Sequence, residues 1–308
     1  MNWFGSVTVF GAGALGSLVG AYLSRVVPVT LVGRRAHVNA VNARGLAVTG
    51  LGERTFPEPL RFARAAEACP PLEGGTLCIV TVKAFDAAAA AKAIVAAGGE
   101  RRDCAAVFLQ NGMGFERDVE SALGGAVTQV GAVSHLGATF VEPGKVEDWG
   151  GEIVCDGSEL GRALADLLAS CGVAARASDD LERERWKKIA LNCALNPVAA
   201  LFGFRNRETL LPELLPVRET ALHECAEVAT ASGVPLSGKG LLREFEERVA
   251  KSNNVNSMLQ DIRARRRTEI DYLNGFFADR GPELNIPCPV NAALAAFIRV
   301  LSMKGGAP

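Results

Sequence analysis

The sequence predicts an α/β domain with an antiparallel extension over residues 1–179, followed by an all-α domain over residues 180–308. In the first part, short apolar runs alternate with segments of helical spacing, the pattern of parallel strands joined by crossover helices. From Leu181 onward the strand patterns disappear, and helical segments are separated by proline and glycine. With 308 residues, 49% of them apolar, the chain is long enough to form two hydrophobic cores.

Composition and charge argue against several classes of partner. The net charge of −1 leaves no basic excess for nucleic-acid binding, and no apolar run reaches the ~20 residues of a membrane span. The N-terminus lacks a secretory signal pattern, so we expect a cytoplasmic protein. The eight cysteines form no CxxC pair and only three histidines occur, so we expect no metal site. Monomer and homodimer both stay open.

A glycine-rich loop near the N-terminus carries the first functional signal. The apolar run 7–10 leads into the motif Gly-Ala-Gly-Ala-Leu-Gly, a helical segment follows over 17–25, and a second apolar run covers 29–32. In this context the glycines allow a tight turn and a close approach of a pyrophosphate to the helix N-terminus. The pattern predicts a Rossmann domain that binds a dinucleotide through Gly11, Gly13, Ala14, Leu15 and Gly16.

The end of the second apolar run discriminates between cofactors. NAD sites usually place a carboxylate there to hold the ribose 2′-hydroxyl, whereas this chain has Gly33, Arg34 and Arg35. A guanidinium pairs with a 2′-phosphate that a carboxylate would repel. We therefore expect NADP(H), with Arg34 as the main contact and Arg35 as a possible stacking or second contact.

Two further apolar runs end in polar residues. The run 77–82 ends at Lys83, and the run 105–109 leads into Gln110, Asn111 and Gly112. Ligands of parallel sheets bind just past the carboxyl ends of the strands, so Lys83 and Asn111 are expected to face the cofactor and the substrate. Beyond them, short strands at 127–133, 138–141, 145–149 and 152–155 predict the antiparallel extension. A helix at 159–170 and a strand at 173–176 are expected to close the domain.

The all-α domain contains a polar stripe on an otherwise apolar helix. Helices are expected at 181–200, 213–232, 238–250, 257–278 and 289–303, with Pro197 weakening or ending the first. In that first helix Lys188, Asn192 and Asn196 recur every four residues and share one face. Burying an amine and two amides is costly without partners, so the stripe either faces solvent or lines a cleft that binds a polar molecule.

A second polar cluster lies further along the same domain. Ser257, Asp261, Arg265 and Glu269 recur at helical spacing. The arginine is best explained by surface ion pairs with its acidic neighbours four residues away. For Ser257 and Glu269 we favour a role in the site.

Hydride transfer to a carbonyl carbon requires a group that stabilises and protonates the oxygen. No tyrosine–lysine pair with YxxxK spacing occurs, which leaves Lys188 as the best general acid. Asn192 and Asn196 can donate to the substrate, Glu269 can orient a hydroxyl or the lysine, and Ser257 can bind a carboxylate. This set of groups suits a 2-oxo acid.

These motifs together resemble the ketopantoate reductase (2-dehydropantoate 2-reductase) family over nearly the whole chain. The matching segments are the glycine loop with Arg34, Val82-Lys83-Ala84, Gln110-Asn111-Gly112, the helix from Trp186 to Pro197, Ser257 to Asp261, and Thr268 to Gly275. The resemblance implies NADPH-dependent reduction of 2-dehydropantoate to (R)-pantoate in pantothenate biosynthesis.

The resemblance also implies roles for single residues. By motif match, Lys188 is similar to the general acid and Glu269 to the carboxylate that binds the substrate. Asn111, Asn192, Asn196 and Ser257 match positions that contact the substrate, Lys83 matches a lysine on the cofactor side, and Asn206 matches a further polar residue.

Other functions stay open at this stage. Asp86 and the segments 134–137 and 147–150 depart from the family pattern, which leaves room for another 2-oxo acid. A β-hydroxyacid-type dehydrogenase shares the glycine loop and a helix with K-x-x-x-N spacing, but the motifs at Ser257 and Glu269 argue against it. A redox sensor that binds NADP without turnover would have no need of Lys188 and Glu269.

Overall fold

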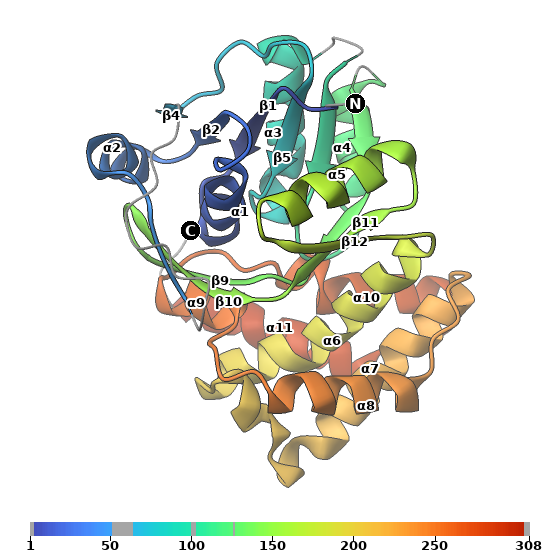
Figure 1. Cartoon of the computed structure of the whole chain (residues 1–308). Helices are drawn as coiled ribbons and strands as arrows, with labels where there is room; N and C mark the ends of the chain where they lie inside the picture. The colour runs from blue at the N-terminus through green and yellow to red at the C-terminus, as the bar shows by residue number, and fades with distance from the viewer. Residues whose placement is uncertain (1–2, 51–63, 100–102, 126, 305–308) are drawn as a thin grey trace. The chain divides into compact units, whose positions relative to one another are not determined.

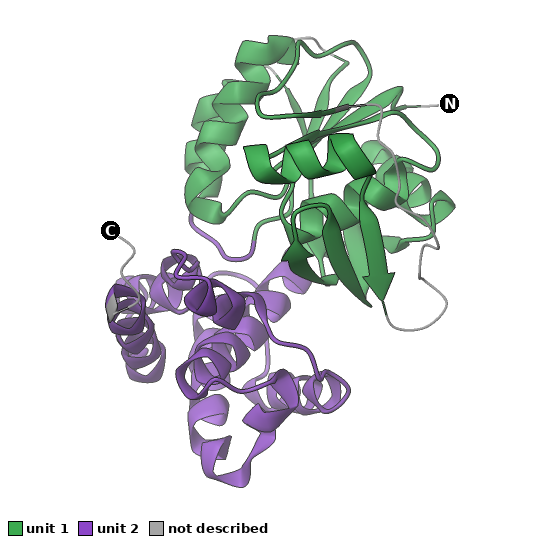
Figure 2. Ribbon diagram, turned by 90° about the vertical axis from the view of Figure 1, so that its left-hand side faces the viewer, with its two compact units in different colours: residues 1–110, 115–181 green, residues 111–114, 182–308 purple. Residues whose placement is uncertain are grey.

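The chain folds into two compact units (Figure 2). The computed structural model describes residues 3–50, 64–99, 103–125 and 127–304. Unit 1 comprises residues 1–110 and 115–181, and unit 2 comprises residues 111–114 and 182–308. The short segment 111–114 therefore leaves the strand that precedes it and belongs to the helical unit.

Unit 1 is built on a six-stranded parallel sheet with the order β4-β2-β1-β5-β6-β7. All five residues of β5 are buried, as expected for a central strand that is covered on both faces. The order, which reverses between β1 and β5, confirms the predicted Rossmann arrangement. Its strands are β1 (Ser6–Phe10), β2 (Val29–Val32), β4 (Arg64–Ala66), β5 (Thr76–Val80), β6 (Ala105–Phe108) and β7 (Thr128–Val130).

Helices connect these strands (Figure 1), and α1, α2 and α5 contribute apolar residues to the core of the unit. Helix α1 begins at Ala14, within the glycine motif, and Gly20 allows the helix to lie close to Leu31 of β2. The helices of unit 1 are α1 (Ala14–Leu23), α2 (Arg35–Arg44), α3 (Ala87–Ile94), α4 (Glu116–Leu123) and α5 (Glu159–Ser170), with the short helical turns η1 (Ala84–Asp86) and η2 (Val95–Gly99).

The predicted antiparallel extension forms two separate three-stranded sheets. The first has the order β3-β10-β9 and the second β12-β11-β8, and each combines one parallel with one antiparallel pair. Neither sheet continues the six-stranded one, and neither is purely antiparallel, since β3 pairs parallel with β10 and β12 pairs parallel with β11. Strand periodicity alone does not reveal these partners. The strands are β3 (Ala47–Gly50), β8 (Ala132–Ser134), β9 (Gly137–Glu142), β10 (Lys145–Gly150), β11 (Glu152–Asp156) and β12 (Ala174–Ser178).

Unit 2 is helical, as predicted, and has its own apolar core. Its α-helices are α6 (Leu181–Phe202), α7 (Leu215–Ala231), α8 (Gly238–Ala250), α9 (Ser257–Arg263), α10 (Asn274–Glu283) and α11 (Pro289–Lys304). Short 3₁₀ turns are η3 (Asn206–Leu210), η4 (Pro212–Leu214) and η5 (Ile270–Tyr272). None of the helices in the described ranges has the length and apolar character that crossing a membrane requires.

Two helix boundaries differ from the prediction. Helix α6 continues through Pro197 to Phe202, so the proline lies inside the helix. The expected helix over 257–278 is broken: α9 ends at Arg263, Arg265 has φ +53°, and α10 begins only at Asn274. An ion pair was expected between Arg265 and Asp261; in the described chain Arg266 forms an ion pair with buried Asp261, at 3.2 Å.

A buried hydrogen bond joins α1 to the first small sheet. Tyr22 donates its hydroxyl to Asp148 Oδ2 at 2.5 Å, and the backbone N–H of Gly150 donates to the other carboxylate oxygen at 2.7 Å. We predict that Tyr22→Phe lowers the free energy of unfolding by about 1–3 kcal/mol, because the buried carboxylate loses a donor. Urea denaturation measures this, with Ser24→Ala as a half-exposed control that should cost less. Equal losses would contradict the role of the buried bond.

Candidate active site

The glycine loop between β1 and α1 is shaped by two close contacts. Gly11 has φ +95°, and a Cβ atom there would lie 2.7 Å from the Val82 backbone nitrogen. A Cβ at Gly16 would lie 2.3 Å from both the Gly11 carbonyl oxygen and Thr81 Oγ1. The fold itself therefore requires glycine at these two positions.

Gly13 is different, because the protein does not crowd it. A Cβ there would meet nothing nearer than the Gly11 carbonyl oxygen at 4.0 Å, and the residue is exposed. It precedes the first turn of α1, where no side chain caps the helix and Ala14 and Leu15 are half-buried. An open glycine before uncapped N–H groups suits an approaching pyrophosphate, so these residues fit a dinucleotide.

The end of β2 presents one arginine that is free for a ligand. Arg34 precedes α2, is exposed and forms no ion pair with the described part of the chain. Arg35 is held by Glu67 through two contacts from Nε, at 3.0 and 3.2 Å. Arg35 thus already has a carboxylate partner, and the two arginines that look alike in sequence differ in availability. Lys83 lies three residues after the end of β5, directly before η1, and is half-buried.

Asn111 is fixed to the helical unit by its neighbours. Gly112 has φ +106°, and a Cβ there would lie 2.4 Å from the carbonyl oxygen of Tyr272. That same oxygen accepts the backbone N–H of Met113 at 2.8 Å. The turn that carries Asn111 is therefore attached to the segment 268–275, which contains Glu269.

The polar stripe of α6 is withdrawn from bulk water. Lys188 and Asn192 are half-buried, and Asn196 is 4% exposed. Within the described ranges, neither of the two asparagine amides forms a hydrogen bond. Trp186 on the same helix is fixed by a bond to Glu182 Oε1 at 2.8 Å and by edge contacts with Phe276 and Phe277. A solvent-facing stripe would not bury Asn196, so this helix face suits a polar ligand.

Lys188 lies among groups that act on its charge in opposite senses. Burial lowers the pKa of Lys188 to about 8 from an ordinary value of 10.5, Glu269 acts to raise it, and Arg185 lowers it further. Burial also lowers the pKa of Arg185 to about 10. Arg185 belongs to no motif of the sequence that pointed to the site, although its position three residues before Lys188 places both cations on one side of α6.

The segments around Ser257 and Glu269 are held by local hydrogen bonds. Asn256 caps α9 by accepting the N–H of Leu259 at 3.0 Å, which places half-buried Ser257 in the first turn. Glu269 is 6% exposed and precedes η5. A buried carboxylate and a half-buried amine that interact in this way are typical of functional sites.

Asn206 has a structural role in this arrangement. Its Nδ2 donates to Ser252 Oγ at 2.9 Å and to Asn254 Oδ1 at 3.0 Å, and its Oδ1 accepts from Asn256 Nδ2 at 3.3 Å. Both hydrogens of the amide nitrogen are thereby donated to the segment that leads into Ser257. We infer that the amide steadies that segment.

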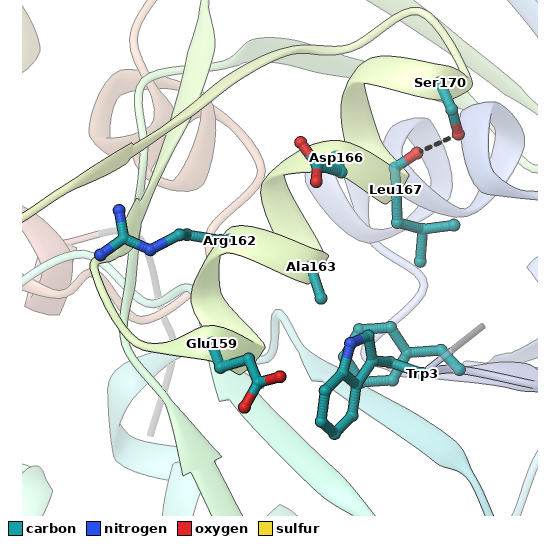
Figure 3. A pocket seen from close by; sticks show the side chains of 8 residues that line it. Trp3, Glu159, Arg162, Ala163, Asp166, Leu167 and Ser170 are labelled. Carbon is teal, nitrogen blue, oxygen red and sulfur yellow. Dashed lines mark hydrogen bonds between the residues drawn. The ribbon is translucent and has the colours of Figure 1, made fainter. Parts of the chain in front are cut away.

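A separate hollow lies beside α5 in unit 1 (Figure 3). It has a volume of about 480 Å³ and is lined by residues that include Trp3, Glu159, Arg162 and Asp166. Its polar side chains are on the solvent-exposed face of α5, and none of the predicted site residues contributes to it. We assign it no role.

Comparison with known proteins identifies the family. Residues 7–154 match the family model described as ketopantoate reductase PanE/ApbA, and residues 180–302 match the model of its C-terminal domain. The chain belongs to the ketopantoate reductase family. It is 32% identical to the 2-dehydropantoate 2-reductase of Pyrococcus horikoshii, over 97% of this chain and 98% of that protein. It is also 32% identical to that of Archaeoglobus fulgidus, over 95% and 96%. As a member of this family the chain is an oxidoreductase that uses a nicotinamide cofactor.

Solved structures agree with this assignment. The crystal structure of the PanE/ApbA family ketopantoate reductase from Ralstonia eutropha JMP134 superposes with a TM-score of 0.88, at 29% identity, covering 98% of this chain and 100% of that one. A ternary structure of D-mandelate dehydrogenase with NADH and anilino(oxo)acetate superposes with a TM-score of 0.85, covering 98% and 100%. At 22% identity, this second likeness concerns the fold alone.

The two kinds of glycine in the loop generate a matched prediction. Gly13→Ala should leave the free energy of unfolding nearly unchanged but weaken binding of the nicotinamide cofactor by about tenfold or more, that is ~1.4 kcal/mol. Gly16→Ala should lower the free energy of unfolding by about 1–3 kcal/mol, because the methyl group meets the loop backbone. Urea denaturation and fluorescence titration with NADPH check both. Loss of stability in Gly13→Ala would contradict an open site at that glycine.

Proposed function

We propose that the protein reduces 2-dehydropantoate to (R)-pantoate with NADPH, and that Lys188 is the general acid. The observation that carries the proposal is the half-buried amine of Lys188, with its pKa lowered to about 8, on a helix face shared with two asparagines that have no partner in the described chain. Family membership supports the reaction type, and the names of the relatives from Pyrococcus and Archaeoglobus support the substrate.

The cofactor supplies the hydride that adds to the carbonyl carbon of the substrate. The residues that would hold its pyrophosphate are Gly11, Gly13, Ala14, Leu15 and Gly16, at the N-terminus of α1. Arg34 would pair with the 2′-phosphate, because its guanidinium is exposed and without an ion-pair partner among the described residues. Lys83 and Asn111 would add contacts from the ends of β5 and β6.

In the proposed mechanism, Lys188 donates its proton to the carbonyl oxygen as negative charge develops there. A lowered pKa makes the ammonium a better acid near neutral pH while it remains mostly protonated. Asn192 and Asn196 donate amide hydrogens to substrate oxygens, and Ser257 donates its hydroxyl to the carboxylate. Glu269 accepts a hydrogen bond from the substrate hydroxyl and keeps Lys188 charged. Asn111 contributes a further amide.

An initial-rate assay tests the substrate directly. With NADPH, 2-dehydropantoate should give the highest kcat/KM in a panel that includes pyruvate, 2-oxoisovalerate and phenylglyoxylate. A higher value for another 2-oxo acid would overturn the substrate while keeping the reaction class. Tight NADPH binding without turnover of any 2-oxo acid would overturn the reaction and favour a non-catalytic sensor.

The role of Lys188 makes a prediction about pH. Reduction needs the protonated amine, so kcat should be constant below about pH 8 and fall above it, whereas an ordinary lysine would place this fall near 10.5. The reverse oxidation needs the neutral amine and should rise with pH through about 8. Pre-steady-state rates of reduction and oxidation, measured as a function of pH, give the two midpoints. A midpoint near 10.5 in either profile would contradict the role of Lys188.

Substitution of the amine gives the complementary prediction. Lys188→Ala should lower turnover by roughly 10²–10⁴ and leave NADPH affinity nearly intact. Lys187→Ala is the matched control, because the neighbouring Lys187 pairs with Glu244 at 2.9 Å. Similar turnover in the two variants would remove the case for Lys188 as the acid.

The two adjacent arginines provide a test of cofactor preference. Arg34→Ala should weaken NADPH binding by about 1–3 kcal/mol and NADH binding much less, because only NADPH carries the 2′-phosphate. Arg35→Ala should change both affinities little, since Glu67 already occupies that guanidinium. Titration of both variants with both cofactors measures the differences, and equal losses for NADPH and NADH in Arg34→Ala would exclude the pairing.

A further inference from the structure

Helix α6 lacks one of its backbone hydrogen bonds because it contains a proline. Pro197 lies inside the helix and has no N–H, so the carbonyl oxygen of Cys193 lacks the partner that an α-helix normally supplies from four residues ahead. The gap falls within the stripe of the proposed site: Lys188 and Asn192 precede it, and Asn196 lies in the interrupted turn. The direction of Asn196 relative to Lys188 therefore depends on how this turn is held.

Asn274, the first residue of α10, fills the gap. Its Nδ2 donates to the Cys193 carbonyl oxygen at 3.0 Å. The same nitrogen donates its second hydrogen to Asn291 Oδ1 at 2.9 Å. Asn274 and Asn291 are both 0% exposed, so water does not compete for these bonds.

The orientation of both amides is dictated by their partners. Asn291 Nδ2 faces the Ala221 carbonyl oxygen at 3.1 Å and Glu224 Oε2 at 2.7 Å, and both of these atoms can only accept when the carboxylate is ionised. Asn291 must therefore present its oxygen to Asn274, and Asn274 must present its nitrogen to Asn291 and to Cys193.

Glu224 anchors the far end of this chain of bonds. Its two oxygens accept the backbone N–H groups of Val290 and Asn291, each at 2.9 Å, in the first turn of α11. A buried series of hydrogen bonds thus runs from the interrupted turn of α6 through α10 to α11 and α7. Asn274 Oδ1 has no hydrogen-bond partner in the described chain, a cost that the two bonds donated by its nitrogen must offset.

We propose that Asn274 is a positioning residue: it replaces the hydrogen bond that Pro197 removes and so fixes Asn196 in register with Lys188. The inference rests on the proposed function for the part that concerns catalysis. The same motif, residues 268–275, meets α6 at two levels, since Glu269 interacts with Lys188 and Asn274 bonds to Cys193 five residues later.

A double-mutant cycle tests this pairing. Pro197→Ala restores an N–H to position 197, which can satisfy the Cys193 carbonyl without help from Asn274. In the protein with Pro197, Asn274→Ala should raise KM for 2-dehydropantoate about tenfold or more and lower the urea midpoint. In the Pro197→Ala background the same change should have an effect at least threefold smaller on KM and a smaller shift of the midpoint.

The same double-mutant cycle with Asn206→Ala in place of Asn274→Ala serves as the control. Asn206→Ala removes another buried amide of unit 2, one that bonds only to the segment 252–256, and it should show no coupling to Pro197→Ala. Equal effects of Asn274→Ala in the two backgrounds would overturn the proposal. If Asn274→Ala does not fold, folding of the double variant supports the proposal, and failure of both contradicts it.

Two readouts separate positioning from general loosening. The pH at which kcat falls should stay near the Lys188 value in Asn274→Ala, because the amine and Glu269 are untouched, whereas loosening of the whole unit would shift the limb and weaken every ligand. The urea midpoint needs no substrate. The cycle on the midpoint therefore tests the bond even if 2-dehydropantoate proves to be the wrong substrate, and the two failures remain distinguishable.

Discussion

The constraint on which the site depends is an amine held partly out of water. Removing an ammonium from solvent disfavours its charge, and the carboxylate of Glu269 opposes this without cancelling it. The balance leaves a group that is still mostly charged at neutral pH but releases its proton far more readily than an ordinary lysine. An apolar side chain at position 188 would be less costly to bury than an amine, but it could not donate a proton.

Contacts to backbone atoms join the segments of unit 2 that carry the proposed site residues. The turn that carries Asn111 is fixed by a close approach of Gly112 to the Tyr272 carbonyl, and α6 is fixed at Cys193 by Asn274. Two segments that are far apart in sequence, the turn at Asn111 and helix α6, are thereby both joined to residues 268–275. The polar side chains of Asn192 and Asn196 are left out of these bonds, which is what a site for a polar ligand requires.

The sequence predicted the features that depend on local pattern. The glycine loop, the parallel strands and the helical second half follow from periodicity and turn chemistry, and all are present. Long-range partners were inaccessible: nothing local tells that β3 and β12 pair outside the main sheet, that Arg35 meets Glu67, or that Asn206 is consumed by residues 252–256. From local sequence Pro197 is expected to weaken or end α6. The amide of Asn274 that bonds to the Cys193 carbonyl lies 77 residues further along the chain, so local pattern could not reveal it. The break at Arg265 needed a left-handed backbone that arginine rarely adopts.

The most direct test of the central claim is the titration of the Lys188 amine itself. Lysine side-chain resonances of the labelled protein, with Lys188 assigned by its loss in Lys188→Arg, can be followed by NMR from pH 6 to 11. The account predicts a midpoint near 8 for Lys188, well below those of exposed lysines. A midpoint near 10.5 would mean that the amine is fully solvated, and the proposed acid would have no basis.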